Sequence, residues 1–158
     1  MSQKSTETGP RAASETPEAA DFVLREAAPG DAGALDALWQ AAGLTRPFND
    51  SRQDIGFALS GPASTILLLE REGHIGASVM VGYDGHRGTV YYVSADPGLR
   101  HLGLGTRIMR AAEDWLTARG VWKLNLMIRP ENEGVRRFYE TLGYEVEERI
   151  VMSRRLGD

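Results

Sequence analysis

The chain has 158 residues, no cysteine and a formal net charge of −4, and 42% of its residues are apolar. This length and composition indicate one globular domain with a buried core. The lack of cysteine excludes disulfides, thiolate metal sites and a cysteinyl acyl intermediate, and the acidic charge argues against a general nucleic-acid surface. The longest apolar run, residues 66–69, is too short to span a membrane. The lack of cysteine fits a cytoplasmic protein, which is the location we expect.

The first 20 residues differ in composition from the rest of the chain. They are mostly Ser, Thr, Glu, Pro and Ala, with almost no large apolar side chain. Such a segment cannot offset its own ordering entropy by burial, and it lacks the apolar stretch of a signal peptide. We therefore predict a disordered tail over residues 1–20 and a single domain over residues 21–158.

Two helices are predicted after a first strand at 22–26. Apolar residues at i, i+3, i+4 and i+7 indicate a helix over 31–42, with Asp31 as its N-cap. A second, shorter helix is expected over 51–59.

The middle of the chain has the alternation and turn residues of an antiparallel meander, with strands predicted at 65–71, 74–83 and 89–94. A helix follows from Leu104, and then a strand at 123–128. Because a helix crosses between them, the strands at 89–94 and 123–128 must be parallel. The remaining predicted elements are a short helix that starts at Asn132 and a final antiparallel strand pair at 143–146 and 150–156.

A glycine-rich segment, residues 96–106, joins the strand at 89–94 to the next helix. A strand that turns through glycines into a helix leaves N–H groups unpaired at the positive end of the helix dipole, which makes an anion site. Gly103 and Gly105 would let a pyrophosphate approach the backbone, and the alternative interpretation is ordinary turn chemistry. A P-loop would have a Lys-Ser or Lys-Thr pair after the glycines, and this segment has none. It also lacks the third glycine of a dinucleotide-binding fingerprint.

Positive charge is concentrated around this segment. Residues 98–137 hold eight Lys and Arg against four acidic residues, a local charge of +4 in a chain whose total is −4. Such a zone suits a polyanionic small molecule such as coenzyme A. The alternative is a solvated helix face with local ion pairs, for instance Arg110 with Asp114.

Two motifs follow one another in this region: Arg100-x-x-Gly103-x-Gly105 and Asn132-x-x-Val135-x-x-Phe138-Tyr139-x-x-x-Gly143-Tyr144. Together they resemble the cofactor motifs of the GNAT superfamily of acyl-CoA-dependent N-acetyltransferases, although alanine is more usual at the position of Val135. The resemblance covers residues 21–156. It implies a mixed α/β fold: a twisted, mainly antiparallel sheet with one parallel central strand pair and helices on both faces.

The resemblance also implies a binding site for acetyl-CoA. Backbone groups at the end of the central strand would bind the pantetheine amides, and N–H groups of the glycine segment would hold the pyrophosphate. Asn132 would contact the pantetheine arm, although by pattern alone it is a plain helix N-cap. The cofactor-binding residues implied in this way are Val93, Ala95, Arg100, His101, Leu102, Gly103, Leu104, Gly105, Thr106, Asn132 and Tyr139.

Tyr139 is the candidate proton donor. An amine that attacks a thioester expels a thiolate, which benefits from a positioned acid, and a phenol can serve. The alternative is a half-buried aromatic residue with a hydrated hydroxyl.

The acceptor amine must lose a proton before it attacks. Many GNAT enzymes place a Glu on the central strand for this step, but the strand at 89–94 carries no carboxylate. Asp84 and His86 in the adjoining turn are the nearest candidates for the general base, with Tyr91 or Tyr92 as a proton relay. The alternative interpretations are turn geometry for Asp84 and a surface histidine for His86.

In this family the connection between the first two helices usually borders the acceptor site. The candidates for substrate binding are therefore Arg46, Phe48, Asn49 and Asp50. The alternative is a capped surface loop. The three histidines of the chain lie in separate segments with no carboxylate at ligand spacing, so no metal site is expected.

The leading hypothesis is an N-acetyltransferase that moves an acetyl group from acetyl-CoA to a primary amine by direct attack in a ternary complex. A non-catalytic acyl-CoA-binding sensor of the same fold is the first alternative. A protein-interaction domain whose glycine segment binds only phosphate or sulfate is the second. The expected partners are a small-molecule or peptide amine, not nucleic acid or a membrane, with a homodimer as one option.

Overall fold

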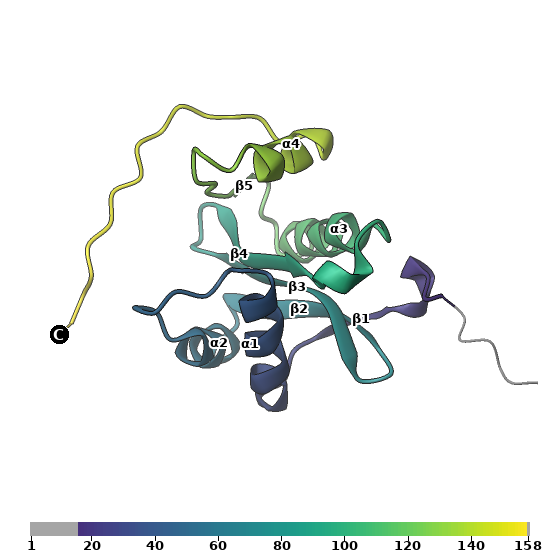
Figure 1. Ribbon diagram of the computed structural model, residues 1–158. Helices are drawn as coiled ribbons and strands as arrows, with labels where there is room; N and C mark the ends of the chain where they lie inside the picture. The colour runs from purple at the N-terminus through teal and green to yellow at the C-terminus, as the bar shows by residue number, and fades with distance from the viewer. Residues whose placement is uncertain (1–15, 158) are drawn as a thin grey trace, which may run out of the picture.

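A computed structural model of the chain describes residues 16–157, and its elements form a mixed α/β structure around one sheet (Figure 1). The strands are β1 (Val23–Glu26), β2 (Ser64–Arg71), β3 (His74–Tyr83), β4 (Gly88–Ala95) and β5 (Leu124–Asn125). The α-helices are α1 (Ala32–Ala41), α2 (Ser51–Leu59), α3 (Leu104–Thr117) and α4 (Glu133–Thr141). The sheet order is β1-β2-β3-β4-β5, antiparallel except for the parallel pair β4–β5. The predicted fold class and the parallel strand pair are confirmed, although β5 lies at the edge of the sheet rather than in its centre.

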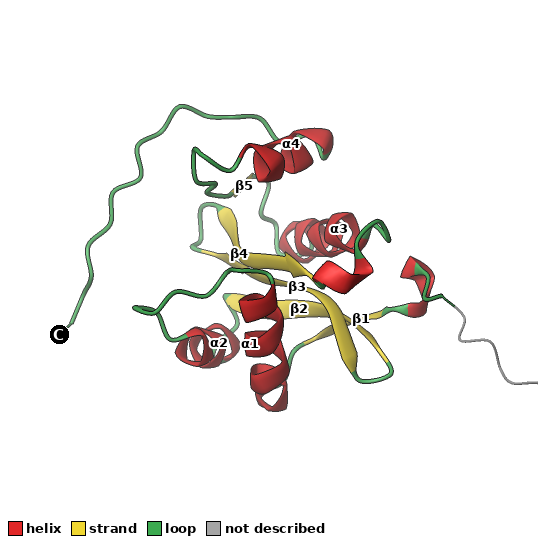
Figure 2. Cartoon of the chain, viewed as in Figure 1, coloured by secondary structure: helices red, strands yellow, loops and turns green. Residues whose placement is uncertain are grey.

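The helices cover both faces of the sheet: α1 and α2 lie on one side, α3 and α4 on the other (Figure 2). The two layers meet different side chains of β2, because successive strand residues point to opposite faces. Ile66 and Leu68 pack with α1 and α2, while Leu67 and Leu69 pack with α3. Burial on both faces explains why residues 66–69 of β2 are a continuous apolar run.

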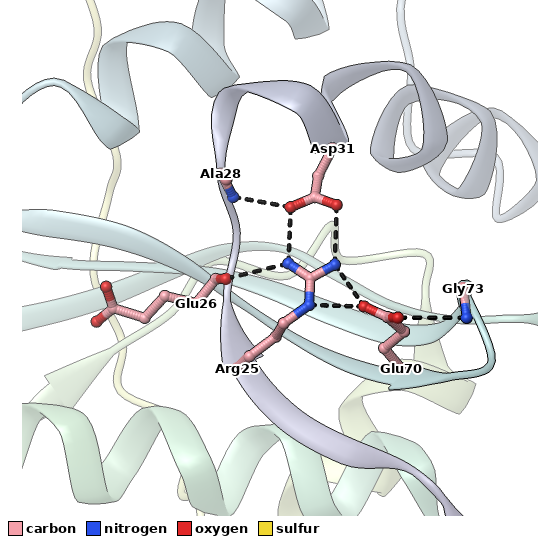
Figure 3. Close-up of polar contacts among 6 residues, drawn as sticks. All are labelled: Arg25, Glu26, Ala28, Asp31, Glu70 and Gly73. Atoms are coloured by element: carbon pink, nitrogen blue, oxygen red, sulfur yellow. Dashed lines mark hydrogen bonds and ion pairs between the residues drawn. The ribbon is translucent and has the colours of Figure 1, made fainter.

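An ion-pair network fastens the edge strand β1 to its neighbours (Figure 3). The Arg25 guanidinium donates to both carboxylate oxygens of Asp31, at 2.8 and 2.9 Å, and its Nε donates to Glu70 on β2 at 2.6 Å. Asp31 also accepts the N–H of Ala28. Asp31 is the N-cap residue of α1, as predicted, but its side chain accepts no hydrogen bond from that helix, because it is occupied by Arg25 and Ala28.

Three other predictions about the termini have different outcomes. Residues 1–15, most of the predicted tail, lie outside the described residues. A 3₁₀ turn at Ala19–Asp21 packs against α3, and the carbonyl of Ala19 accepts a hydrogen bond from Arg107. Contacts with the folded domain therefore begin before residue 21, where the domain was predicted to start. The final strand pair at 143–146 and 150–156 is absent: the chain runs extended after α4 and forms no ladder. The residues between the two predicted strands, 147–149, are Glu, Glu and Arg, and none of them favours a tight turn.

Within residues 16–157, no helix has the length and apolarity needed to cross a membrane.

Candidate functional site

The candidate site begins where the two parallel strands part. β5 pairs with β4 only at Gly88 and Thr89, although a strand was predicted over 123–128. Farther along, β4 carries a bulge: the register against β3 shifts between Ser78 and Met80, and Tyr92 has a positive φ of 50°. A bulge bends its strand, and a positive φ in a tyrosine is strained, which is typical of functional sites. The β5-facing edge of β4 beyond Thr89, which includes Val93 and Ala95, therefore has no strand partner among the described residues.

The glycine segment lies directly after this open edge. His101 and Gly103 both have positive φ, and the first backbone bond of α3 runs from Arg107 N–H to Gly103 O. Within the described part of the chain, no protein group accepts a hydrogen bond from the N–H groups of residues 100–106, and α3 has no side-chain cap. These unpaired donors at the positive end of α3 fit an anionic group. Leu104 itself is buried, so its contribution is limited to its backbone.

Helix α4 packs against the start of α3. A Cβ at Gly105 would lie 3.4 Å from Cζ of Phe138, so a larger residue at this position would press on α4. Asn132 caps α4, since its Oδ1 accepts from Val135 N–H at 3.4 Å. The interpretation of Asn132 as an N-cap is confirmed, and its contact with a cofactor stays a prediction.

Tyr139 lies on the buried side of α4, with only 7% of its surface exposed. Its ring packs edge-on against Phe138 and Tyr144, at centroid distances of 5.1 and 5.6 Å. Burial raises the pKa of Tyr139 to about 12 because it disfavours the charged phenolate. Every fully buried side-chain polar atom of the described residues has a hydrogen-bond partner, and the Tyr139 hydroxyl has none, so the hydroxyl must reach the surface. It is therefore free to donate to a ligand.

A polar cluster occupies the opposite face of the sheet at the bulge. The Tyr92 ring stacks on Trp39, with centroids 3.9 Å apart, and its hydroxyl donates to Asp54 Oδ2 at 2.7 Å. Asn49 Nδ2 donates to the same Asp54 oxygen at 2.6 Å and to the Tyr92 hydroxyl at 2.7 Å. Burial, and then the bond to Asp54, raises the pKa of Tyr92 to about 12. The cluster brings a carboxylate from α2 to the central strand.

Asp54 is a candidate that the residue patterns did not single out, although a signal existed. The buried positions of α2 are Ser51, Ile55 and Ala58, and Asp54 completes the i, i+3, i+4, i+7 stripe that they define. A carboxylate on the core-facing stripe of a helix is unusual and indicates a specific partner. Tyr92 was predicted only as one of two relay candidates.

Asp84 and His86, the predicted general bases, lie at the other end of β4. Asp84 Oδ1 accepts the N–H groups of His86 and Arg87 at 2.8 and 2.7 Å, and these bonds lower its pKa. At about 3.3 Å per residue, the four residues from Gly88 to Tyr92 put this turn about 13 Å or more from the bulge. The geometry supports the turn interpretation of Asp84.

The predicted substrate-binding residues of the loop between α1 and α2 are divided among several roles. Asn49 reaches the Tyr92 cluster, whereas Asp50 caps α2 by accepting from Arg52 and Gln53 N–H groups. Arg46 donates to carbonyl groups of its own loop, and Phe48 is 70% exposed. Beside them lies a polar hollow of about 540 Å³. Its lining residues include Asp36, Gln40, Arg46, Asn49, Asp50 and Arg52. No group of three or more metal-ligating side chains occurs among residues 16–157.

Known proteins resemble this chain in sequence and in fold. The sequence profile of the acetyltransferase (GNAT) family matches residues 33–144. The chain is 41% identical over 119 residues to acetyltransferase YE1169 of Yersinia enterocolitica, covering 75% of this chain and 84% of the relative. It is 40% identical over 126 residues to acetyltransferase ECA0875 of Pectobacterium atrosepticum, covering 80% and 89%. In fold it is similar to the aminoglycoside N-acetyltransferase AAC(6')-Iy in complex with CoA, with a TM-score of 0.73 at 16% identity over 85% of this chain and 94% of that one.

Proposed function

Because this chain belongs to the GNAT family of acetyltransferases, we propose that it transfers the acetyl group of acetyl-CoA to a primary amine, by direct attack in a ternary complex. The observation that carries the proposal is the juxtaposition of two sets of unpaired backbone groups. One set is the open edge of β4, and the other is the N–H groups of residues 100–106. An extended amide chain fits the first set, and a pyrophosphate fits the second.

The cofactor-binding residues act mainly through their backbone in this proposal. Val93 and Ala95 bind the pantetheine amides in place of the missing strand neighbour. The segment from Arg100 to Thr106 binds the pyrophosphate, where the lack of a Cβ at Gly103 and Gly105 permits close approach. This use of backbone donors explains why a segment with few charged side chains can hold a polyanion.

In this proposal the proton donor and the proton acceptor lie on opposite faces of the sheet. The amine nitrogen attacks the thioester carbon, a C–N bond forms and the C–S bond breaks. On the face of α4, the Tyr139 hydroxyl donates its proton to the departing thiolate, and its pKa of about 12 keeps it protonated at neutral pH.

On the face of α2, Asp54 is better placed than Asp84 or His86 to receive the proton of the amine, directly or through water. Tyr92 and Asn49 hold Oδ2 of Asp54, and its Oδ1 accepts no hydrogen bond within the described residues. A carboxylate at this place also favours a cationic amine as the acceptor.

A thermal melt with and without acetyl-CoA tests the cofactor site. Ligand at a hundred times its Kd stabilises a protein by about 2.7 kcal/mol, which is a shift of several degrees for a domain of this size. Gly105→Glu should abolish the shift, because it puts a carboxylate beside the N–H groups and crowds Phe138. Thr106→Glu is a second variant with an exposed side chain, and Gly61→Glu, whose Cβ would meet nothing within 4 Å, is the matched control. A well-folded protein that shows no shift at millimolar acetyl-CoA would contradict the proposal.

One observation favours a non-catalytic acyl-CoA-binding module as the second candidate: β4 carries no carboxylate. The two candidates differ in turnover. Release of free thiol from acetyl-CoA in the presence of a panel of amines supports the enzyme. An acetyl-CoA-dependent melting shift with no thiol release from any amine supports the module.

A further inference from the structure

The glycine segment begins with a turn that Asp96 holds in place. Asp96 follows β4, and its N–H donates to the carbonyl of Gly76 on β3 at 2.8 Å. Its Oδ1 accepts the N–H of Gly98 at 2.8 Å, and its carbonyl accepts the N–H of Leu99 at 2.9 Å. These bonds close a 3₁₀ turn that leads directly into the unpaired N–H groups of residues 100–106. A change in the orientation of Asp96 would therefore move the start of the segment that carries those donors.

The second carboxylate oxygen of Asp96 is bonded to a side chain from a different part of the chain. His74 Nε2 lies 2.6 Å from Asp96 Oδ2, across 22 residues of sequence. An ionised carboxylate can only accept hydrogen bonds, so the histidine nitrogen donates this one. Both oxygens of the carboxylate are thus fixed, one by the turn and the other by His74.

His74 is held firmly at the start of β3. It follows a tight turn in which Glu72 and Gly73 both have positive φ, at 50° and 81°. The N–H of Gly73 donates to Glu70, a member of the ion-pair network that fastens β1 (Figure 3). Because the hairpin is tied to the edge of the sheet in this way, it presents the His74 ring as a fixed support for the carboxylate.

The bond between His74 and Asp96 is partly shielded from solvent on the side of the carboxylate. The Asp96 side chain is 24% exposed and the His74 side chain 60%. A hydrogen bond to a charged group keeps part of its strength at such exposure. The carboxylate also lies just before a segment suited to an anion, so a donor on its Oδ2 reduces its repulsion of an anionic ligand. Among residues 16–157, no other side chain donates to Asp96.

We propose that His74 is a positioning residue for the cofactor: through its bond to Asp96, it holds the segment at residues 100–106 in the orientation that binds the pyrophosphate. This role rests on the proposed function, because the segment is a cofactor site only if the chain binds CoA. His74 contacts neither the acetyl group nor the amine in this arrangement. It therefore acts on the affinity for the cofactor through the geometry of another residue.

Calorimetric titration of the full-length protein with CoA tests this role. His74→Ala should weaken the affinity for CoA by about three- to tenfold, the effect of losing one partly exposed hydrogen bond to a carboxylate. His74→Gln should restore most of the affinity, because the amide nitrogen of glutamine can take the place of Nε2 and donate to Asp96. Gln53→Ala, which removes an exposed polar side chain of α2, should bind CoA as the wild type does. Thermal melts without ligand should show that all three variants are folded.

A double-mutant cycle shows whether His74 acts through Asp96. Asp96→Ala should weaken CoA binding by itself, and the addition of His74→Ala should then have no further effect. Additive losses in the double variant, or a loss in His74→Ala that glutamine does not restore, would overturn the positioning role.

The titration of the wild type separates this role from the proposed function. A wild-type protein that binds no CoA at millimolar concentration would contradict the proposed function, and the role of His74 would fall with it. A wild-type protein that binds CoA, together with a His74→Ala variant of equal affinity, would overturn the role of His74 alone.

Discussion

The hydroxyl of Tyr92 lies 2.7 Å from the carboxylate of Asp54, across 38 residues of sequence. This bond joins the bulge of β4 to the first turn of α2, and the stacking of Tyr92 on Trp39 fixes the ring that donates it. The strained backbone of Tyr92 is therefore held in place from the α1–α2 face of the sheet. The face of the sheet opposite to Tyr139 thus has its own carboxylate, although β4 supplies none.

Asp54→Asn should lower kcat/KM for the amine at least tenfold, since a positioned general base typically contributes about 10²- to 10⁴-fold. The amide keeps an oxygen that accepts from Tyr92 but loses the charge and the ability to take a proton. Steady-state kinetics at neutral pH would measure the loss, and the acetyl-CoA-dependent melting shift should be unchanged. Asp114→Asn, the same change at an exposed position of α3, should have no effect. Equal kinetics for the Asp54 and Asp114 variants would remove Asp54 from the mechanism.

Tyr139→Phe should lower kcat by at least roughly tenfold, because the variant loses the proton donor for the thiolate. Its binding of acetyl-CoA should persist, since the ring and its contacts with Phe138 and Tyr144 remain. The raised pKa predicts that activity does not fall through ionisation of Tyr139 between pH 7 and 10. Tyr83→Phe, at the end of β3 beside Trp115, is the control, because this hydroxyl has no part in the proposed reaction. Wild-type turnover in the Tyr139 variant would show that solvent protonates the thiolate.

Most of the fold is predictable because local patterns and burial agree. The apolar stripe of α3, the alternating strands and the crossover rule are enough to order the sheet. The segment after α4 is different: its apolar alternation predicts strands, but a strand needs a neighbour, and residues 143–156 pair with none in the described part of the chain. For the same reason the length of β5 was overestimated.

The two halves of the candidate site differ in how far the sequence reveals them. The glycine segment and α4 are contiguous motifs, so spacing alone indicates them. The Tyr92–Asp54–Asn49 cluster joins three segments through side chains, and it depends on a bulge that no residue type signals. Asp84 looked suitable because it is close to β4 in sequence, whereas Asp54 is close in space.

Gly76→Ala should destabilise the protein by about 1 to 3 kcal/mol, the usual cost of overpacking. A Cβ at this position of β3 would lie 2.5 Å from Cε1 of Phe22 and 2.9 Å from Cδ1 of Leu104, and both side chains are buried. Gly56→Ala is the matched change in α2, where a Cβ meets nothing within 4 Å, and it should stabilise by about 0.5 to 1 kcal/mol. Urea denaturation of both variants measures the difference. Loss of stability in both would indicate that the glycines serve flexibility rather than close packing.

Asp31→Asn should reduce the loss of unfolding free energy that acidification causes in the wild type. The hydrogen bonds from Arg25 lower the pKa of Asp31. The Asp31 carboxylate therefore binds a proton less tightly in the folded protein than in the unfolded chain. The resulting stabilisation is fully present above the ordinary Asp pKa of about 3.9 and is lost as the pH falls through the lower folded value. At pH 7 the variant should be less stable by about 1 kcal/mol, the usual net contribution of one hydrogen bond, because the Arg25 side chain is 39% exposed and solvent weakens the charged pair.

Urea denaturation at pH 7 and at pH 3 or below measures both parts of this prediction. The difference in unfolding free energy between wild type and Asp31→Asn should be smaller at the lower pH. Protonation of Asp31 in the wild type removes the same charge that the substitution removes. Asp114→Asn, at an exposed position of α3, should lie within about 0.5 kcal/mol of wild type at both values. An equal deficit of the Asp31 variant at both pH values would assign its effect to lost hydrogen-bond geometry at Ala28 and Arg25 rather than to charge.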